Sequence, residues 1–162
     1  MWRIKLKARS KKQIIIIGRI MFYIYILLLS YFLFFSERYG RDLVTKEYNL
    51  QLFKEIKRFL KYRKQIGFEA FVVNIFGNIF AFSPFGFFLP LLNKSYRKFY
   101  IVAILSVIFS LVIETAQLLL KVGVFDVDDI LMNSVGGMLG YLAFFILYSV
   151  YKRIYGHKGS WR

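Results

Sequence analysis

The sequence is poor in the residues that most catalytic and metal sites use. It has no cysteine, one histidine and two prolines, and only 9 acidic residues against 24 basic ones. Without cysteine the chain cannot form a disulfide, a thiolate nucleophile or a cysteine-ligated zinc or iron–sulfur site. The single His157, near the end of the chain, cannot build a multi-histidine metal site by itself. Much conventional enzyme chemistry is therefore excluded, and the sequence by itself requires no cofactor.

Hydrophobic sequence is what the chain has in excess. Of its 162 residues 58% are hydrophobic, well above the roughly 45–50% of soluble domains, and the mean hydropathy is +0.51. A helix needs about 20 apolar residues to cross a bilayer. Four stretches satisfy this, and the only charges inside them are Arg19 and Glu114; they are residues 14–35, 71–92, 99–120 and 130–151. We predict an all-α integral membrane protein, a bundle of four transmembrane helices.

The segments outside these helices are basic and give a prediction of orientation. Residues 1–13 and 152–162 would be basic cytoplasmic ends of a single membrane domain over residues 14–151. With both ends in the cytoplasm, 13 flanking Lys and Arg residues lie on that side and 10 on the other, in keeping with the positive-inside rule. We expect a multi-pass protein of the cell membrane. Basic ends beside membrane helices favour anionic lipid head groups over nucleic acid as partners.

The loop after the first helix contains an amphipathic pattern. Over residues 50–62, Leu52, Phe53 and Leu60 recur at helical spacing with Lys and Arg between them. This pattern is typical of a helix lying on the bilayer surface. The alternative is a helix that packs across the bundle as a lid.

The second predicted helix carries polar and helix-breaking residues. Asn74 and Asn78 are four residues apart and share a face. Pro84 and Gly86 follow, and a proline removes one helical hydrogen bond. We predict a kink or a break there. The two amides could line a site or could join helices through hydrogen bonds.

The third predicted helix has one polar face near its end. Ser110, Glu114 and Gln117 are separated by four and three residues, which aligns them on an otherwise apolar helix. A charged residue within a membrane segment is costly and usually faces the bundle interior or a water-filled cavity. Glu114 is therefore a candidate binding residue.

Three acids gather where the fourth helix begins. Asp126, Asp128 and Asp129 are followed by Asn133, four residues after Asp129. One interpretation is structural: Asp126 caps the helix, and three glycines allow close helix packing, namely Gly136, Gly137 and Gly140. The other is a site that binds a ligand, relays protons, or holds a divalent cation on Asp126, Asp128 and Asp129.

These motifs together resemble the VanZ-like family of bacterial membrane proteins. The matching segments cover residues 48–56 (YNLQLFKEI), 74–90 (NIFGNIFAFSPFGFFLP), 110–117 (SLVIETAQ) and 125–141 (FDVDDILMNSVGGMLGY). The resemblance implies a four-helix membrane protein. For the namesake of the family it also implies reduced susceptibility to the glycopeptide teicoplanin, and it supplies no established reaction.

The function expected from these features is recognition of an envelope amphiphile at the outer membrane face. The ligand would be a lipid-tailed glycopeptide or a lipid-linked cell-wall precursor, bound without catalysis by Asn74, Asn78, Glu114, Gln117, Asp126, Asp129 and Asn133. One alternative is an enzyme that acts on lipid head groups through the carboxylates. A small transporter is the third alternative, although no inverted repeat is evident.

Overall fold

The computed structural model describes residues 2–35, 48–54, 57, 58, 60–62 and 68–155. Its long helices are α1 (Trp2–Phe35), α3 (Phe68–Leu92), α4 (Phe99–Leu119) and α5 (Val127–Tyr155). Each contains a segment long and apolar enough to cross a membrane, at Gln13–Phe35, Ile75–Leu92, Phe99–Leu119 and Val127–Ile154. The prediction of an all-α bundle of four transmembrane helices is confirmed.

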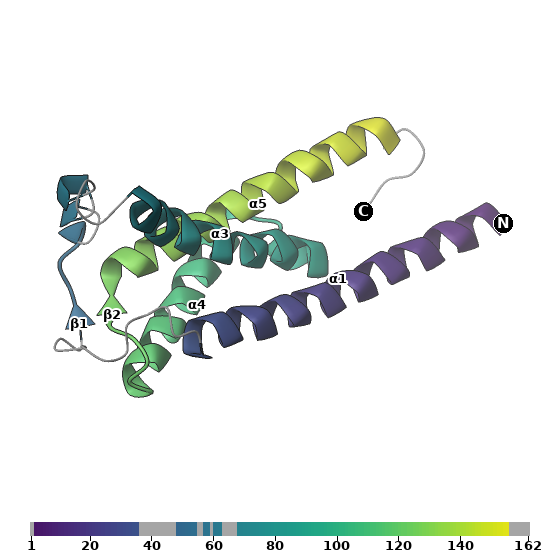
Figure 1. The fold of residues 1–162 in the computed structure, drawn as a ribbon. Helices are drawn as coiled ribbons and strands as arrows, with labels where there is room; N and C mark the ends of the chain where they lie inside the picture. The colour runs from purple at the N-terminus through teal and green to yellow at the C-terminus, as the bar shows by residue number, and fades with distance from the viewer. Residues whose placement is uncertain (1, 36–47, 55–56, 59, 63–67, 156–162) are drawn as a thin grey trace.

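α1 begins and α5 ends at the same end of the bundle, whereas α4 ends and α5 begins at the opposite end (Figure 1). We call this opposite end the polar end. An even number of membrane crossings accounts for the shared position of the start of α1 and the end of α5. Which end faces the cytoplasm stays a prediction.

α5 is the central helix of the bundle. In its spanning segment 44% of the residues are buried, compared with 11% in α1. Its glycines explain the difference, because a Cβ atom on Gly136 would overlap the carbonyl of Ile79, and one on Gly140 would overlap that of Ser83. The backbones of α3 and α5 are therefore in direct contact, as small residues permit in membrane helix pairs.

α1 packs on the outside of the other helices. Leu29 and Leu33 form a core cluster with Phe82 of α3 and Ile113 of α4. The hydroxyl of Tyr25 donates a hydrogen bond to the carbonyl of Ala81 at 2.9 Å. Most other large apolar side chains of α1 are exposed, and in a membrane protein such a surface faces lipid.

A kink or a break was predicted at Pro84 and Gly86. The break does not occur, since α3 is continuous from Phe68 to Leu92, and the kink stays a prediction. Proline at position 84 leaves the carbonyl of Phe80 without its helical donor. The hydroxyl of Ser83 donates to that carbonyl at 3.1 Å, the kind of compensation that lets a membrane helix contain proline. Gly86 serves close packing instead, because a Cβ atom there would overlap the carbonyl of Gly137.

The helix in the first loop begins later than predicted. Lys54 is helical, as are residues 57, 58 and 60–62, whereas residues 50–53 are not. Phe53 has a φ of 63°, which a right-handed helix does not accept. The described apolar side chains of this segment are exposed, namely Leu52, Phe53, Leu60 and Tyr62. Both the surface position on the membrane and the alternative of a lid across the bundle stay predictions.

An arginine joins two helices at the end opposite the polar end. Arg97 follows the short 3-10 helix η3 (Lys94–Tyr96). Its guanidinium donates to the carbonyl of Pro90 and to the hydroxyl of Tyr148, at 3.3 Å each. The hydroxyl of Tyr141 donates to the carbonyl of Arg97 at 2.7 Å. The connection between α3 and α4 is thereby fixed against α5.

Candidate functional site

The polar face of α4 is turned into the bundle. Ser110 is fully buried, Glu114 is 3% exposed and Gln117 is 7% exposed. Ser106, one turn earlier on the same face, is also buried. The spacing of four and three residues aligns these side chains, whereas many apolar residues of α4 are exposed, among them Ile104, Val107, Ile108, Leu111 and Val112.

The start of α5 lies against this face. β2 (Phe125–Asp126) leads directly into α5, and the backbone amide of Asp126 donates to Glu114 Oε2 at 3.2 Å. The carboxylate of Asp126 accepts the amide of Asp128 at 2.8 Å, so Asp126 acts as the N-cap of α5. This cap explains why α5 begins at Val127, three residues before the predicted start at residue 130.

The first loop reaches the same place, which the sequence did not indicate. β1 (Tyr48–Asn49) pairs in parallel with β2, with Asn49 opposite Asp126. The side-chain amide of Asn49 donates to Asp126 Oδ2 at 3.0 Å. The backbone amide of Phe53 donates to the carboxylate of Asp128, which is fully buried. Asp126 and Asp128 therefore hold the first loop on the polar end.

Asn49 is thus a site residue that the sequence analysis missed. Neither a strand of two residues nor an isolated asparagine in a long loop gives a periodic signal. The segment that contains Asn49 belonged to the family resemblance, and that was the only available signal.

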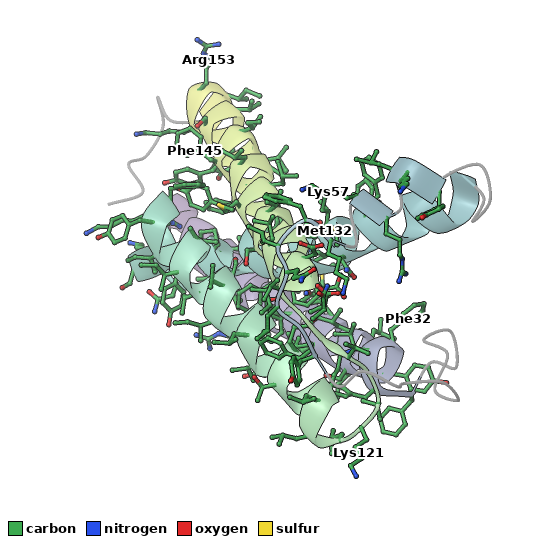
Figure 2. All side chains as sticks on the ribbon, turned by 90° about the vertical axis from the view of Figure 1, so that its left-hand side faces the viewer. Phe32, Lys57, Lys121, Met132, Phe145 and Arg153 are labelled. Atoms are coloured by element: carbon green, nitrogen blue, oxygen red, sulfur yellow. The ribbon has the colours of Figure 1, made fainter. Side chains whose placement is uncertain are left out.

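A second pair joins α3 to α5. The side-chain amide of Asn78 donates to Asp129 Oδ1 at 2.7 Å. Asp129 is three residues after Asp126, whose backbone amide donates to Glu114. Asn78, Glu114, Asp126 and Asp129, from α3, α4, β2 and α5, therefore meet at the polar end. Figure 2, viewed from this end, shows nitrogen and oxygen atoms gathered close to the buried Met132.

Asn133 lies one turn below the acids on α5. Its amide nitrogen donates to the hydroxyl of Ser110 at 3.0 Å. Its Oδ1 atom is buried without a hydrogen-bond partner, as is the hydroxyl of Ser106. Buried polar atoms are nearly always hydrogen-bonded in proteins. An unpaired acceptor next to a carboxyl cluster is a place where a donor from a ligand would be stabilised.

One of the predicted site residues, Gln117, contacts a different part of the bundle. The amide of Gln117 donates to the carbonyl of Leu33 at 3.3 Å, and Leu33 lies in the last turn of α1. The carbonyl groups in the last turn of a helix have no hydrogen-bond partner within that helix. Gln117 supplies one and thereby fixes the end of α1. Asn74 lies in α3, and its side chain is outside the described residues.

The acids do not assemble as a metal centre. Within the described parts of the chain, no three acidic or histidine side chains come together in an arrangement that could hold a metal ion. Of the three candidates, Asp126 and Asp128 instead accept hydrogen bonds from the first loop. Asp129 accepts one from Asn78.

Comparison with known proteins identifies the family. Residues 22–148, about three quarters of the chain, match VanZ/LLP1. The chain belongs to the VanZ/LLP1 family. No curated protein and no solved structure matches it. The VanZ/LLP1 region contains β1, β2, most of the bundle and every residue of the site described above, so this site is a feature of the family region and not of the basic ends.

Proposed function

We propose that this VanZ/LLP1 protein recognises an amphiphile of the cell envelope at the outer face of the cell membrane. By doing so it would lower susceptibility to lipid-tailed glycopeptides such as teicoplanin. The proposal includes the cytoplasmic location of both chain ends, which would put the polar end outside. Membrane lipids and the glycopeptide, or a lipid-linked cell-wall precursor, are the partners it requires.

The burial of charged and amide groups inside the polar end is the observation that carries this proposal. Glu114 is 3% exposed and Asn133 is 2% exposed, although both lie within membrane-spanning helices. Ionisable groups placed this way cost about 2.5–3.5 kcal/mol each on insertion scales and usually mark a binding site or pathway. The burial of Asp126 is explained by its role as the N-cap of α5. The burial of Asp128 is explained by its contact with the first loop. Neither explains Glu114 or the unpaired Asn133 Oδ1 atom.

A growth assay tests the proposal directly. A bacterium expressing the protein is challenged with two glycopeptides that differ only in their lipid tail. Variant Glu114→Gln replaces the buried carboxyl group with an amide of nearly the same shape, and Asp126→Ala is a second site variant. Lys121→Gln is the control, because Lys121 is an exposed charge in the loop between α4 and α5. Membrane insertion of every protein is checked by immunoblotting of membrane fractions.

Protection limited to the lipid-tailed compound, lost in Glu114→Gln and kept in Lys121→Gln, is the expected result. Equal sensitivity at confirmed expression would count against the resistance role. In that case the remaining role of the carboxyl cluster would be sought in assays of lipid head-group turnover.

A further inference from the structure

The end of the bundle opposite the polar end has basic residues and no acidic ones to neutralise them. The sequence contains no Asp or Glu in residues 70–113 or 130–162. These ranges include η3, the start of α4 and the end of α5. α1, which begins at the same end, has no acidic residue either. The described basic residues of the two ranges are Lys94, Arg97, Lys98, Lys152 and Arg153.

The guanidinium of Arg97 is held in a fixed orientation. Its Nε atom donates to the carbonyl of Pro90 and its Nη1 atom to the hydroxyl of Tyr148, at 3.3 Å each. It also lies over the ring of Tyr148, 4.8 Å from the ring centre. These bonds explain why the half-buried side chain of Arg97 points along α5 and does not extend freely into solvent.

Arg97 has hydrogen-bond donors left over. A guanidinium carries five N–H donors, and two of them are used by Pro90 and Tyr148. The other three, which include both on Nη2, have no acceptor among the described residues. Nη2 is not one of the buried side-chain atoms that lack a partner, so it reaches the surface. An acceptor from outside the protein can therefore bind there.

Two exposed lysines lie close to this guanidinium. Lys98 is the next residue in the chain, and its Nζ atom is 5.9 Å from the ring centre of Tyr100. Lys152 is one turn after Tyr148, on the same face of α5. Positive charges from the α3–α4 connection and from α5 are thereby brought together around Arg97.

This basic cluster of Arg97, Lys98 and Lys152 is at the depth of lipid head groups. The spanning segments Ile75–Leu92 and Phe99–Leu119 end and begin on either side of Arg97. Tyrosine is enriched at this level of membrane proteins, and Tyr100 is 57% exposed there. The acceptor that the cluster meets is therefore a lipid head group.

We propose that the basic cluster binds the phosphate group of an anionic phospholipid. A guanidinium can donate two parallel N–H bonds to a phosphate, and basic pockets between membrane helices bind anionic head groups in this way. Zwitterionic phospholipids also contain a phosphate, but their cationic group would be repelled by Lys98 and Lys152, and no carboxylate of these elements would accept it. The polar end has no part in this site, so it does not depend on the proposed function.

The test measures lipid binding to the full chain in dodecyl maltoside by native mass spectrometry. The two probes are dioleoylphosphatidylglycerol and dioleoylphosphatidylcholine, which share their tails and differ in net charge. We expect phosphatidylglycerol to bind at least about tenfold more tightly. Equal binding of the two lipids would overturn the proposal. Displacement of phosphatidylglycerol by millimolar inorganic phosphate would also overturn it, in favour of a site for free phosphate.

Matched variants separate this site from general attraction to a basic protein. Arg97→Gln should lower the preference for phosphatidylglycerol about tenfold, whereas Lys121→Gln, which removes the same charge from an exposed residue at the polar end, should keep it. Arg97→Lys should also lose most of the preference, because an ammonium cannot form the paired bonds. An equal loss in Arg97→Gln and Lys121→Gln would show that net charge alone attracts the lipid and would overturn the proposal.

Lys152→Gln keeps the test valid if the Arg97 variants do not fold. Lys152 is exposed, and its replacement leaves the bonds of Arg97 to Pro90 and Tyr148 in place. The preference for phosphatidylglycerol should fall about threefold in Lys152→Gln, with an unchanged melting temperature. An unchanged preference in this variant would contradict the position of the site.

Discussion

Asn49 and Asp126 are 77 residues apart in the chain and are joined twice, by strand register and by a side-chain hydrogen bond of 3.0 Å. The bond ties the first loop to the residue that caps α5. Because Asp126 also donates its backbone amide to Glu114, residues 48–53, the cap of α5 and the buried carboxyl group of Glu114 form one connected unit. The order of the first loop should therefore depend on this one asparagine.

Replacing Asn49 with alanine should loosen the first loop. A hydrogen bond to a charged group contributes about 1.5–3 kcal/mol. Without it, the strand pairing and the contact of Phe53 with Asp128 would still connect residues 48–53 to the start of α5. Hydrogen exchange of residues 48–54 in Asn49→Ala should be faster than in the unaltered protein. Tyr48→Ala is the control, since Tyr48 is 62% exposed in the same strand. Unchanged exchange in Asn49→Ala would show that the side-chain bond does not hold the loop.

The protein should be more stable with glycine than with alanine at position 53. The φ of Phe53, 63°, is in the left-handed region, which costs roughly 1–2 kcal/mol for a residue with a Cβ atom. Phe53→Gly and Phe53→Ala both remove the phenyl ring. Glycine avoids this backbone cost but loses more conformational entropy on folding, about 0.5–1 kcal/mol, which is the smaller of the two effects. We expect Phe53→Gly to unfold at the higher temperature of the two. The opposite order would mean that the loop changes conformation in the variants.

Alanine substitutions at Gly140 and Gly77 should have different effects on the stability of the bundle. A Cβ atom on Gly140 would overlap the backbone of α3, whereas one on Gly77 has no atom within 4 Å. Gly140→Ala should destabilise the bundle by about 1–3 kcal/mol, as overpacking does. Gly77→Ala should be neutral or stabilise by about 0.5–1 kcal/mol through helix propensity. Thermal unfolding in the same detergent compares the two, and equal melting temperatures would contradict the close contact.

The hydroxyl of Ser83 should contribute to the stability of the protein only while residue 84 is proline. Ser83→Ala removes the donor that satisfies the carbonyl of Phe80, at a cost of about 0.5–1.5 kcal/mol. In a Pro84→Ala background the backbone amide of residue 84 can donate to that carbonyl, so the same change should cost almost nothing. A double-mutant cycle measures the difference. Additive effects would show that the hydroxyl has no role in keeping α3 continuous.

Local properties of the sequence were sufficient for the fold class. Four long apolar stretches predict four membrane helices because the bilayer thickness alone sets their length. The helical spacing of Ser110, Glu114 and Gln117 placed them correctly on one face. The break at Pro84 was predicted wrongly, because the rule about proline counts a lost hydrogen bond and cannot show that a neighbouring serine supplies another.

Sequence by itself determined that this protein crosses a membrane four times, because hydropathy and helical period depend only on nearby residues. It also selected Glu114, Asp126 and Asn133 as candidates, because polar side chains in apolar segments stand out. Only the tertiary structure decided which of these meet. Asn49 joins Asp126 through pairing of two distant strands, and Gln117 turns instead to the end of α1. Such contacts depend on how the helices and the first loop pack, and no local spacing encodes them.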